Sequence, residues 1–492
     1  MQNINNEDIF GLVNSLTKSE KAYFKKYSNQ HVKGDKNDYM LVFEIFEKTY
    51  DNKKINFEKE FEKLKITNIS RVKNYLHDVI LKSLISYHAE NSIDAEIRED
   101  LRKIEVLWNK SLHEQCSKLL AKVKKNIEKY DKKQFLLEVL EWESKLIVEK
   151  PTINGVFNDL LSNRDHFLFT LQGITKQVEY DFLGRSFSLS FQSKHQELIS
   201  NNLTFISNVE KLIVKNSEEV VEDGNLKISH YLVTILYYIS NKNYDQAKAT
   251  SEKLLNYVIQ NENYIVSNLV KYIAIIIVNV VLNYDLKDLK NAKRFVEILD
   301  KIENKYSKFC SDEIKNILKF EYIICSINLL IEDNNDIELQ QFIIKEVEEC
   351  AIDTEFSHLS REAVYYFSIS RAYFNLNNYK LALLWLNKLF NNKKFEASYL
   401  YNNALVYELI VHYELNNFDY IENKIRSLKR YFKMNNNIEL NIIKVLEKYI
   451  IDKMDKIEIY ELKNSIENDE IIQKFSTNFG KFSFVRWINK KM

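Results

Sequence analysis

The sequence predicts an all-α protein in which helical hairpins stack into an α-solenoid behind an N-terminal helical segment. Three observations predict this class. The chain has 492 residues but only 1 Pro and 7 Gly, which is too few for the many tight turns of a large sheet. Apolar residues recur at helical spacings of three and four. One pattern of two apolar stripes joined by a short polar link occurs several times, which favours a repeat architecture.

The first expected element is an N-terminal helical segment over residues 1–92. In Ser15–Tyr27, Thr17 is followed three positions later by Glu20, the capping-box pattern of a helix start. Further on, Ile66–Leu84 carries an apolar stripe at helical spacing, formed by Ile69, Val72, Leu76, Val79, Ile80 and Leu84. We expect this segment to cap the array, because a terminal unit must present a polar outer face.

Irregular helical hairpins are expected over residues 93–214, and the repeated array over 226–492. A faint copy of the hairpin pattern lies at Ile104–Val123. The chain's only Pro lies in Glu149–Phe157, which is expected to be a loop or kink, and the acidic stretch Lys215–Asn225 is expected to be a linker.

The repeat is clearest at Ala372–Leu389 (AYFNLNNYKLALLWLNKL) and His412–Leu428 (HYELNNFDYIENKIRSL), with earlier copies around NKNY at Asn241–Tyr244 and LKDLKNA at Leu286–Ala292. Asn tolerates left-handed backbone better than other non-Gly residues, so these links are expected to end one helix and begin the next. Ala382, at the start of a second helix, is expected to let two helices approach closely. A lone hairpin cannot bury its apolar face, so the copies must stack.

This order of residues resembles the tetratricopeptide repeat over about 230–303 and 363–435. The resemblance implies an array that binds a protein or peptide on its concave face, and position by position it implies that Arg371, Asn375 and Asn403 line that face. The Pro that often closes a repeat of this family is absent from every copy, so irregular, tetratricopeptide-like hairpins are expected.

Two pieces of the N-terminal segment resemble the helix-turn-helix of LuxR-type regulators, namely LT..E at Leu16–Glu20 and VKN at Val72–Asn74. This resemblance implies that Lys73 and Asn74, with the nearby basic Arg71, would contact DNA. However, 55 residues separate Thr17 from Val72, more than that compact motif spans. A helical cap is therefore the primary interpretation, and DNA binding is the alternative.

Several chemical functions are excluded by spacing. No two glycines lie closer than 11 residues, which excludes the dinucleotide fingerprint, the phosphate-binding P-loop and the nucleophile elbow of α/β-hydrolases. The nine histidines form no H-E-x-x-H motif, and the four cysteines form no C-x-x-C. We therefore expect no catalytic residues, no cofactor and no metal.

Charge and hydropathy limit the classes of partner that the protein is expected to bind. The 70 basic and 70 acidic residues cancel, so no strong field attracts nucleic acid or anionic lipid. The most apolar run, Tyr272–Leu282, is 11 residues long, whereas a membrane span needs ~20. The few cysteines favour a reducing compartment, and the N-terminus has no signal-peptide pattern.

The sequence thus favours a cytoplasmic, non-enzymatic scaffold that binds a protein or peptide, and it leaves the partner, the pathway and the oligomeric state open. Nucleic acid and membrane are not the expected partners. The alternatives are a transcriptional regulator that combines N-terminal DNA-binding helices with a sensor array, and an enzyme of unrecognised type.

Overall fold

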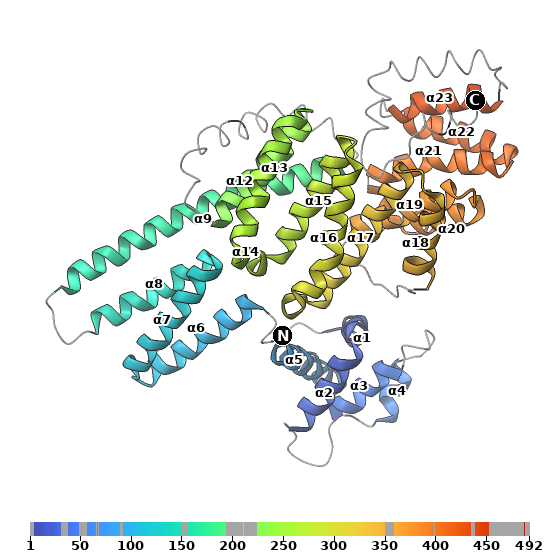
Figure 1. The fold of residues 1–492 in the computed structure, drawn as a ribbon. Coiled ribbons are helices and arrows are strands. Elements are labelled where there is room, and N and C mark those ends of the chain that lie inside the picture. Colours follow the sequence, from blue (N-terminus) through green and yellow to red (C-terminus); the bar gives the residue numbers. More distant parts are fainter. Residues whose placement is uncertain are drawn as a thin grey trace. The chain divides into compact units, whose positions relative to one another are not determined.

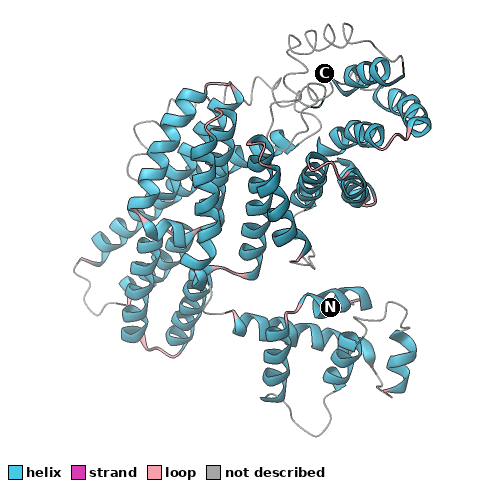
Figure 2. Ribbon diagram, turned by 45° about the vertical axis from the view of Figure 1, so that its right-hand side comes forward, coloured by secondary structure: helices cyan, strands magenta, loops and turns pink. Residues whose placement is uncertain are grey.

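The protein is described by a computed structural model, in which all regular secondary structure of the described residues is helical (Figures 1 and 2). This confirms the predicted all-α class. The described residues are 4–30, 38–48, 57–64, 66, 68–88, 92–149, 155–192, 210, 224–349, 359–397, 399–433, 438–451 and 487.

The chain divides into two compact units, residues 1–123 and 124–492. The division falls inside a helix, and the sequence-based boundary at residue 92 falls inside the first unit. Residues 211–223 lie outside the described part, so the predicted boundary between 214 and 226 stays a prediction, as does most of the expected linker Lys215–Asn225.

The first unit begins with α1 (Asn6–Ser15), α2 (Lys18–Gln30), α3 (Asp38–Lys48), α4 (Phe57–Lys63) and α5 (Ile69–Tyr87), followed by α6 (Ile93–Asn109) and the start of α7 (His113–Tyr130). The predicted stripe of α5 is its core face, because Leu76, Val79 and Ile80 are buried against α1, α2 and α3. The capping box at the start of α2 is also confirmed. The Thr17 amide donates to Glu20 Oε2 at 2.8 Å, and the Glu20 amide donates to Thr17 Oγ1 at 3.2 Å.

The second unit continues with α8 (Lys133–Val148), α9 (Val156–Gln192), α12 (Gly224–Ser240), α13 (Tyr244–Gln260), α14 (Glu262–Ser267), α15 (Leu269–Asp285), α16 (Leu289–Lys305), α17 (Asp312–Glu332), α18 (Asp336–Ile343), α19 (Leu359–Asn375), α20 (Tyr379–Phe390), α21 (Tyr399–Glu414), α22 (Phe418–Lys433) and α23 (Ile438–Ile451). Three short 3-10 or π-helical turns cover Ser307–Phe309, Ile344–Glu348 and Lys393–Ala397.

One type of turn joins the helices of each hairpin. At Asn377 the backbone is left-handed, with φ 59°, and its amide donates to the Phe374 carbonyl at 3.0 Å. The next amide, of Asn378, donates to the Tyr373 carbonyl at 2.8 Å, which completes a Schellman motif. The Asn378 side chain then caps α20 by accepting from the Leu381 amide at 3.3 Å. The predicted role of this Asn link is confirmed.

The same pair of backbone hydrogen bonds recurs in seven described joints. Each has a non-glycine residue with φ between 50° and 59° at the end of the first helix. These residues are Ser111, Asp131, Lys242, Lys287, Asn334, Asn377 and Asn416. Two of the joints, at Asp131 and Asn334, were not singled out by the sequence pattern.

Two large apolar cores lie in the later part of the second unit, with a smaller one formed by Val280, Ala292, Val296, Cys325 and Leu329. Of the two large cores, one lies among α12–α17 and contains Ile235, Ala247 and Leu299, and the other lies among α17–α23 and contains Ala382 and Leu409. The predicted stripes therefore supply the cores. α17 contributes to both large cores. It lies between α16 and α19 and contacts each of them (Figure 1).

Candidate functional site

The three residues predicted to contact a partner lie on α19 and α21. Arg371 is 5% exposed, and its guanidinium donates to Asn328 Oδ1 on α17 at 2.5 Å. The resemblance implied that Arg371 lines a partner-binding face, whereas its side chain lies packed between helices. α19 contacts α17 on one side and α20 and α21 on the other, so nearly all of its faces are covered.

The other two predicted residues are also engaged inside the array. Asn403 is 6% exposed on α21. Asn375 is half-buried at the end of α19, and its side-chain amide donates to the Arg371 carbonyl at 2.8 Å. The structure thus brings Arg371 and Asn375 together through a backbone contact, and it leaves Asn375 as the most accessible of the three.

Polar contacts around Arg371 connect four helices. Tyr284 on α15 donates to Glu332 Oε2 on α17 at 3.2 Å, and Tyr407 on α21 donates to the Ser370 carbonyl on α19 at 3.3 Å. Burial raises the pKa of Tyr284 to about 12, opposed by the positive charge of Arg371 and reinforced by Glu332. These groups hold neighbouring helix pairs in register.

A second polar cluster joins α9, α12 and α15. The Lys271 ammonium donates to Ser229 Oγ at 2.7 Å and lies 3.4 Å from Asp181 Oδ1. Ser229 Oγ donates to the same Asp181 oxygen at 3.1 Å, and Gln177 Nε2 donates to it at 2.9 Å. Burial lowers the pKa of Lys271, and the charge of Asp181 opposes that shift.

A lysine beside a serine can form an acyl-transfer dyad, in which the lysine accepts the serine proton. Here the direction is different, because Ser229 donates to Asp181 and receives a hydrogen bond from Lys271. Ser229 is also only 3% exposed within α12, which keeps a substrate carbonyl away from its hydroxyl. The cluster is better explained as a structural contact that joins three helices.

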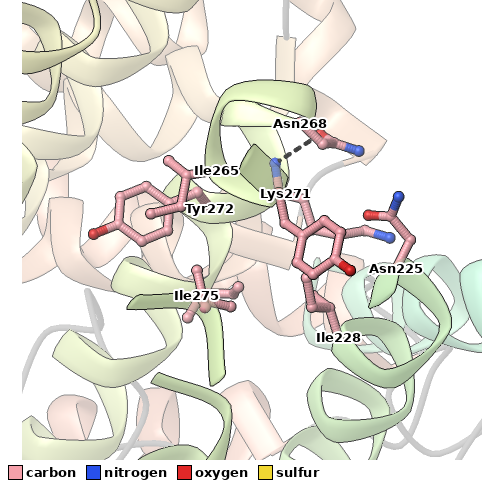
Figure 3. Close-up of a pocket in the computed structure, with 9 residues that line it drawn as sticks. Asn225, Ile228, Ile265, Asn268, Lys271, Tyr272 and Ile275 are labelled. Atoms are coloured by element: carbon pink, nitrogen blue, oxygen red, sulfur yellow. Dashed lines mark hydrogen bonds between the residues drawn. The ribbon is translucent and has the colours of Figure 1, made fainter. Parts of the chain in front are cut away.

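Figure 3 shows a hollow beside Lys271, with Tyr272 and Ile275 on one wall and Asn225 and Ile228 on the other. Its volume is about 10 Å³, which is room for about one water molecule and far less than the ~300–1,000 Å³ of small-molecule sites. The complete lining is Asn225, Ile228, Val258, Tyr264, Ile265, Asn268, Lys271, Tyr272 and Ile275. Its size and mainly apolar lining do not indicate a cofactor site.

The residues predicted for the alternative DNA-binding function lie at the start of α5. Lys73 Nζ donates to Asn6 Oδ1 at 2.8 Å, and Asn74 Oδ1 accepts from the Ile4 amide at 3.2 Å. Both side chains therefore secure the start of α1 within their own unit, whereas Arg71 is exposed.

α9 carries an exposed apolar strip that was not predicted from the sequence. Six large apolar side chains of this helix are between 42% and 72% exposed, and all but Phe169 lie in one line, namely Phe157, Leu168, Leu171, Val178 and Phe182. Their signal is an alternation of four- and three-residue steps, which also takes in Leu161, Arg164, Thr175 and Arg185. These nine positions are called the α9 seam below.

Among the described residues, no group of three or more His, Cys, Asp or Glu side chains is placed to hold a metal ion. In the same part of the chain, none of the helices combines the length and apolarity that a membrane crossing needs. Comparison of the chain with family models, with curated proteins and with solved structures finds no match.

Proposed function

We propose that this protein is a non-enzymatic scaffold that binds a protein or a peptide, and that it is an α-solenoid of tetratricopeptide-like hairpins with an N-terminal helical cap. A cytoplasmic location belongs to the same proposal. The observation that carries it is the sevenfold use of one Schellman joint between consecutive helices. Stacked hairpins of this kind present long surfaces, and such surfaces suit extended partners better than small molecules.

The burial of Arg371 and Asn403 refines this proposal. Within the array, these two side chains position helices, so a partner must contact other residues. Asn375, half-buried at the end of α19, stays the candidate contact on this face.

The alternative functions have less support. A DNA-binding regulator would need Lys73 and Asn74 to be available, yet Lys73 is hydrogen-bonded to Asn6 at the start of α1 and Asn74 to Ile4 just before it. For an enzyme, the strongest candidate is Ser229 with Lys271, and its hydroxyl proton is directed to Asp181.

Affinity capture from cells of the native host, followed by mass spectrometry, tests the scaffold. The bait is the full chain, with and without nuclease treatment, and Ala382→Trp is the control because it should disrupt the α19–α20 hairpin. A reproducible set of proteins that resists nuclease and is lost with Ala382→Trp is the expected result.

Two results would contradict the proposal. A set of proteins that disappears with nuclease, together with a gel shift that weakens steeply with salt, would favour the regulator instead. Recovery of no protein above background in any condition would remove the support for a scaffold.

A further inference from the structure

α9 is a 37-residue helix that uses only part of its circumference for packing inside the chain. At 1.5 Å per residue it is roughly 55 Å long. It packs on α8, where Asn163 contacts Glu143, and on α12, where Tyr180 contacts His230. Figure 1 shows α9 extending past both of these helices. The α9 seam lies on the remaining face.

The exposure of the seam is not explained by ordinary surface composition. Single apolar side chains are common on protein surfaces, but a contiguous strip marks a contact site. Phe157 and Phe182 are 72% and 65% exposed, and Leu168, Leu171 and Val178 continue the strip between them. Water therefore covers a face about 25 residues long, roughly 37 Å at 1.5 Å per residue, on which Arg164 and Thr175 lie between the apolar side chains.

The spacing of the seam positions indicates which secondary structure a partner would place against them. Steps of four and three repeat without interruption from Phe157 to Arg185, which is a heptad pattern. A strict seven-residue repeat keeps one narrow seam against a second helix that supercoils around the first. A lipid surface instead favours a wide apolar face with basic flanks. The pattern therefore favours a helix as the occupant.

Charge next to the seam indicates the chemistry of that helix. On one flank of the seam, the exposed residues that follow Phe157, Arg164, Leu171 and Val178 are Asn158, Asp165, Gln172 and Glu179. Two of them are carboxylates and none is basic. Arg164 lies 2.8 Å from Asp165, with both side chains more than 60% exposed, so it offsets part of the negative charge of this flank.

A second copy of the same chain fits this flank poorly. In an antiparallel pair of α9 helices, Asp165 and Glu179 would face the carboxylates of the other copy, because equivalent flanks meet. In a parallel pair Asp165 would face Leu160 and Glu179 would face Ile174, which are apolar residues on the opposite flank. A partner with Lys or Arg at the flanking positions satisfies both the seam and the carboxylates.

We propose that the α9 seam is the docking site for one amphipathic helix of another protein, with apolar residues at heptad spacing and basic residues beside Asp165 and Glu179. This rests on the proposed scaffold function, and it names the surface and the chemistry of a partner. Arg164, Thr175 and Arg185 interrupt the apolar seam, and polar seam residues of this kind fix the register of the pair.

Fluorescence anisotropy with the full chain tests the proposal. It uses two fluorescein-labelled synthetic helices, each about four heptads long. Both carry Leu and Ile at the seam positions, and their flanks are Lys in one peptide and Glu in the other. We expect the Lys peptide to bind at micromolar concentration and the Glu peptide to bind at least about tenfold more weakly. The double variant Asp165→Lys/Glu179→Lys should reverse this preference.

Matched variants of α9 separate docking from nonspecific adhesion. Leu171→Glu changes the middle of the seam and should weaken binding of the Lys peptide at least about tenfold. Phe169→Glu changes a side chain of the same helix that is 72% exposed and outside the seam, and it should have little effect. Circular dichroism should show unchanged helicity for both variants, because both sites are exposed.

Three results would overturn this docking site. They are equal binding by the wild type and Leu171→Glu, a peptide preference that the double charge variant leaves unchanged, and a dimer in light scattering that Leu171→Glu dissociates. The last would assign the seam to a second copy of the chain. None of these results affects the capture of host proteins by other surfaces, so a failure here is distinguishable from a failure of the scaffold function.

Discussion

A guanidinium inside a helical array needs a hydrogen-bond partner, and Arg371 has one in Asn328. Both side chains lie within the array, with Asn328 fully buried and Arg371 nearly so. Along the sequence, Arg371 lies off the apolar stripe of α19, and a single helix considered alone would leave it in water. Its burial depends on α17 and α21, which the local pattern does not place.

Replacing Arg371 should therefore cost stability. We expect Arg371→Ala to lower the free energy of unfolding by about 2–4 kcal/mol, because it removes a charged hydrogen bond and leaves the Asn328 carbonyl oxygen buried. Arg426→Ala is the matched control, since the Arg426 side chain is 68% exposed, and it should change stability by less than ~0.5 kcal/mol. Urea unfolding followed by circular dichroism measures both, and equal midpoints would contradict the structural role of Arg371.

Asp285 makes stability depend on pH. Burial at the end of α15 raises its pKa from 3.8 to about 6, and Lys287 opposes the shift. Between these values the folded state holds a proton that the unfolded state has lost, so stability falls as pH rises from about 4 to about 6.

Asp285→Asn should accordingly stabilise the fold at pH 7, by on the order of 1–3 kcal/mol, and the gain should vanish near pH 4. Melting temperatures of the wild type and the variant across this range measure the effect. Asp333→Asn, at the exposed end of α17, is the control and should show no such trend. A pH-independent gain would indicate a cause other than the Asp285 proton.

At the scale of the element, the backbone geometry of the hairpin joint is constant, whereas the residue type at its left-handed position varies. The left-handed position is occupied by Asn in three joints and by Ser, Asp or Lys in the other four. The geometry is the same in all seven, since each uses the same two backbone hydrogen bonds. The backbone bonds define the joint, and the side chain only sets its energetic cost.

Substitution by Gly should have opposite effects on stability at Lys242 and at Lys253. Lys242 has φ 57°, so Lys242→Gly should relieve left-handed strain and stabilise the protein by about 0.5–1 kcal/mol. Lys253 is exposed within α13, so Lys253→Gly should destabilise it by about 1 kcal/mol. Thermal unfolding measures both signs, and a loss of stability at Lys242 would mean that its side chain contributes more than the strain costs.

Local signals explain which elements the sequence could predict. The stripes, the capping box at Thr17 and the Asn-containing joints depend on residues a few positions apart, and the structure confirms each of them. The two joints that the sequence did not predict lack the full pattern, because Asn334 has an Asn link but no aromatic directly after it and Asp131 has neither. The polar clusters around Arg371 and Lys271 join helices that lie far apart in sequence, which no local pattern reports.

At the scale of the whole molecule, the second unit has separate cores rather than one. Leu318 belongs to the core among α12–α17, and Phe320, two residues later on α17, belongs to the core among α17–α23. Helix pairs that contact mainly their neighbours unfold in a nearly one-dimensional manner, so damage to one pair should spread only to adjacent pairs.

Ala382→Trp tests how far such damage spreads. Ala382 is fully buried between α19 and α20, and its carbonyl accepts a hydrogen bond from Ser370 Oγ at 2.7 Å. Overpacking this contact should cost about 1–3 kcal/mol or more. Amide hydrogen exchange should become faster in α17, α19, α20 and α21 and stay unchanged in α12 and α13, because α12 and α13 belong to the other core.

Leu384→Trp is the control, at a position of α20 that is 49% exposed, and it should leave exchange unaltered throughout. Uniformly faster exchange across the described helices of the second unit would instead mean that it unfolds as one cooperative body, which would contradict a solenoid.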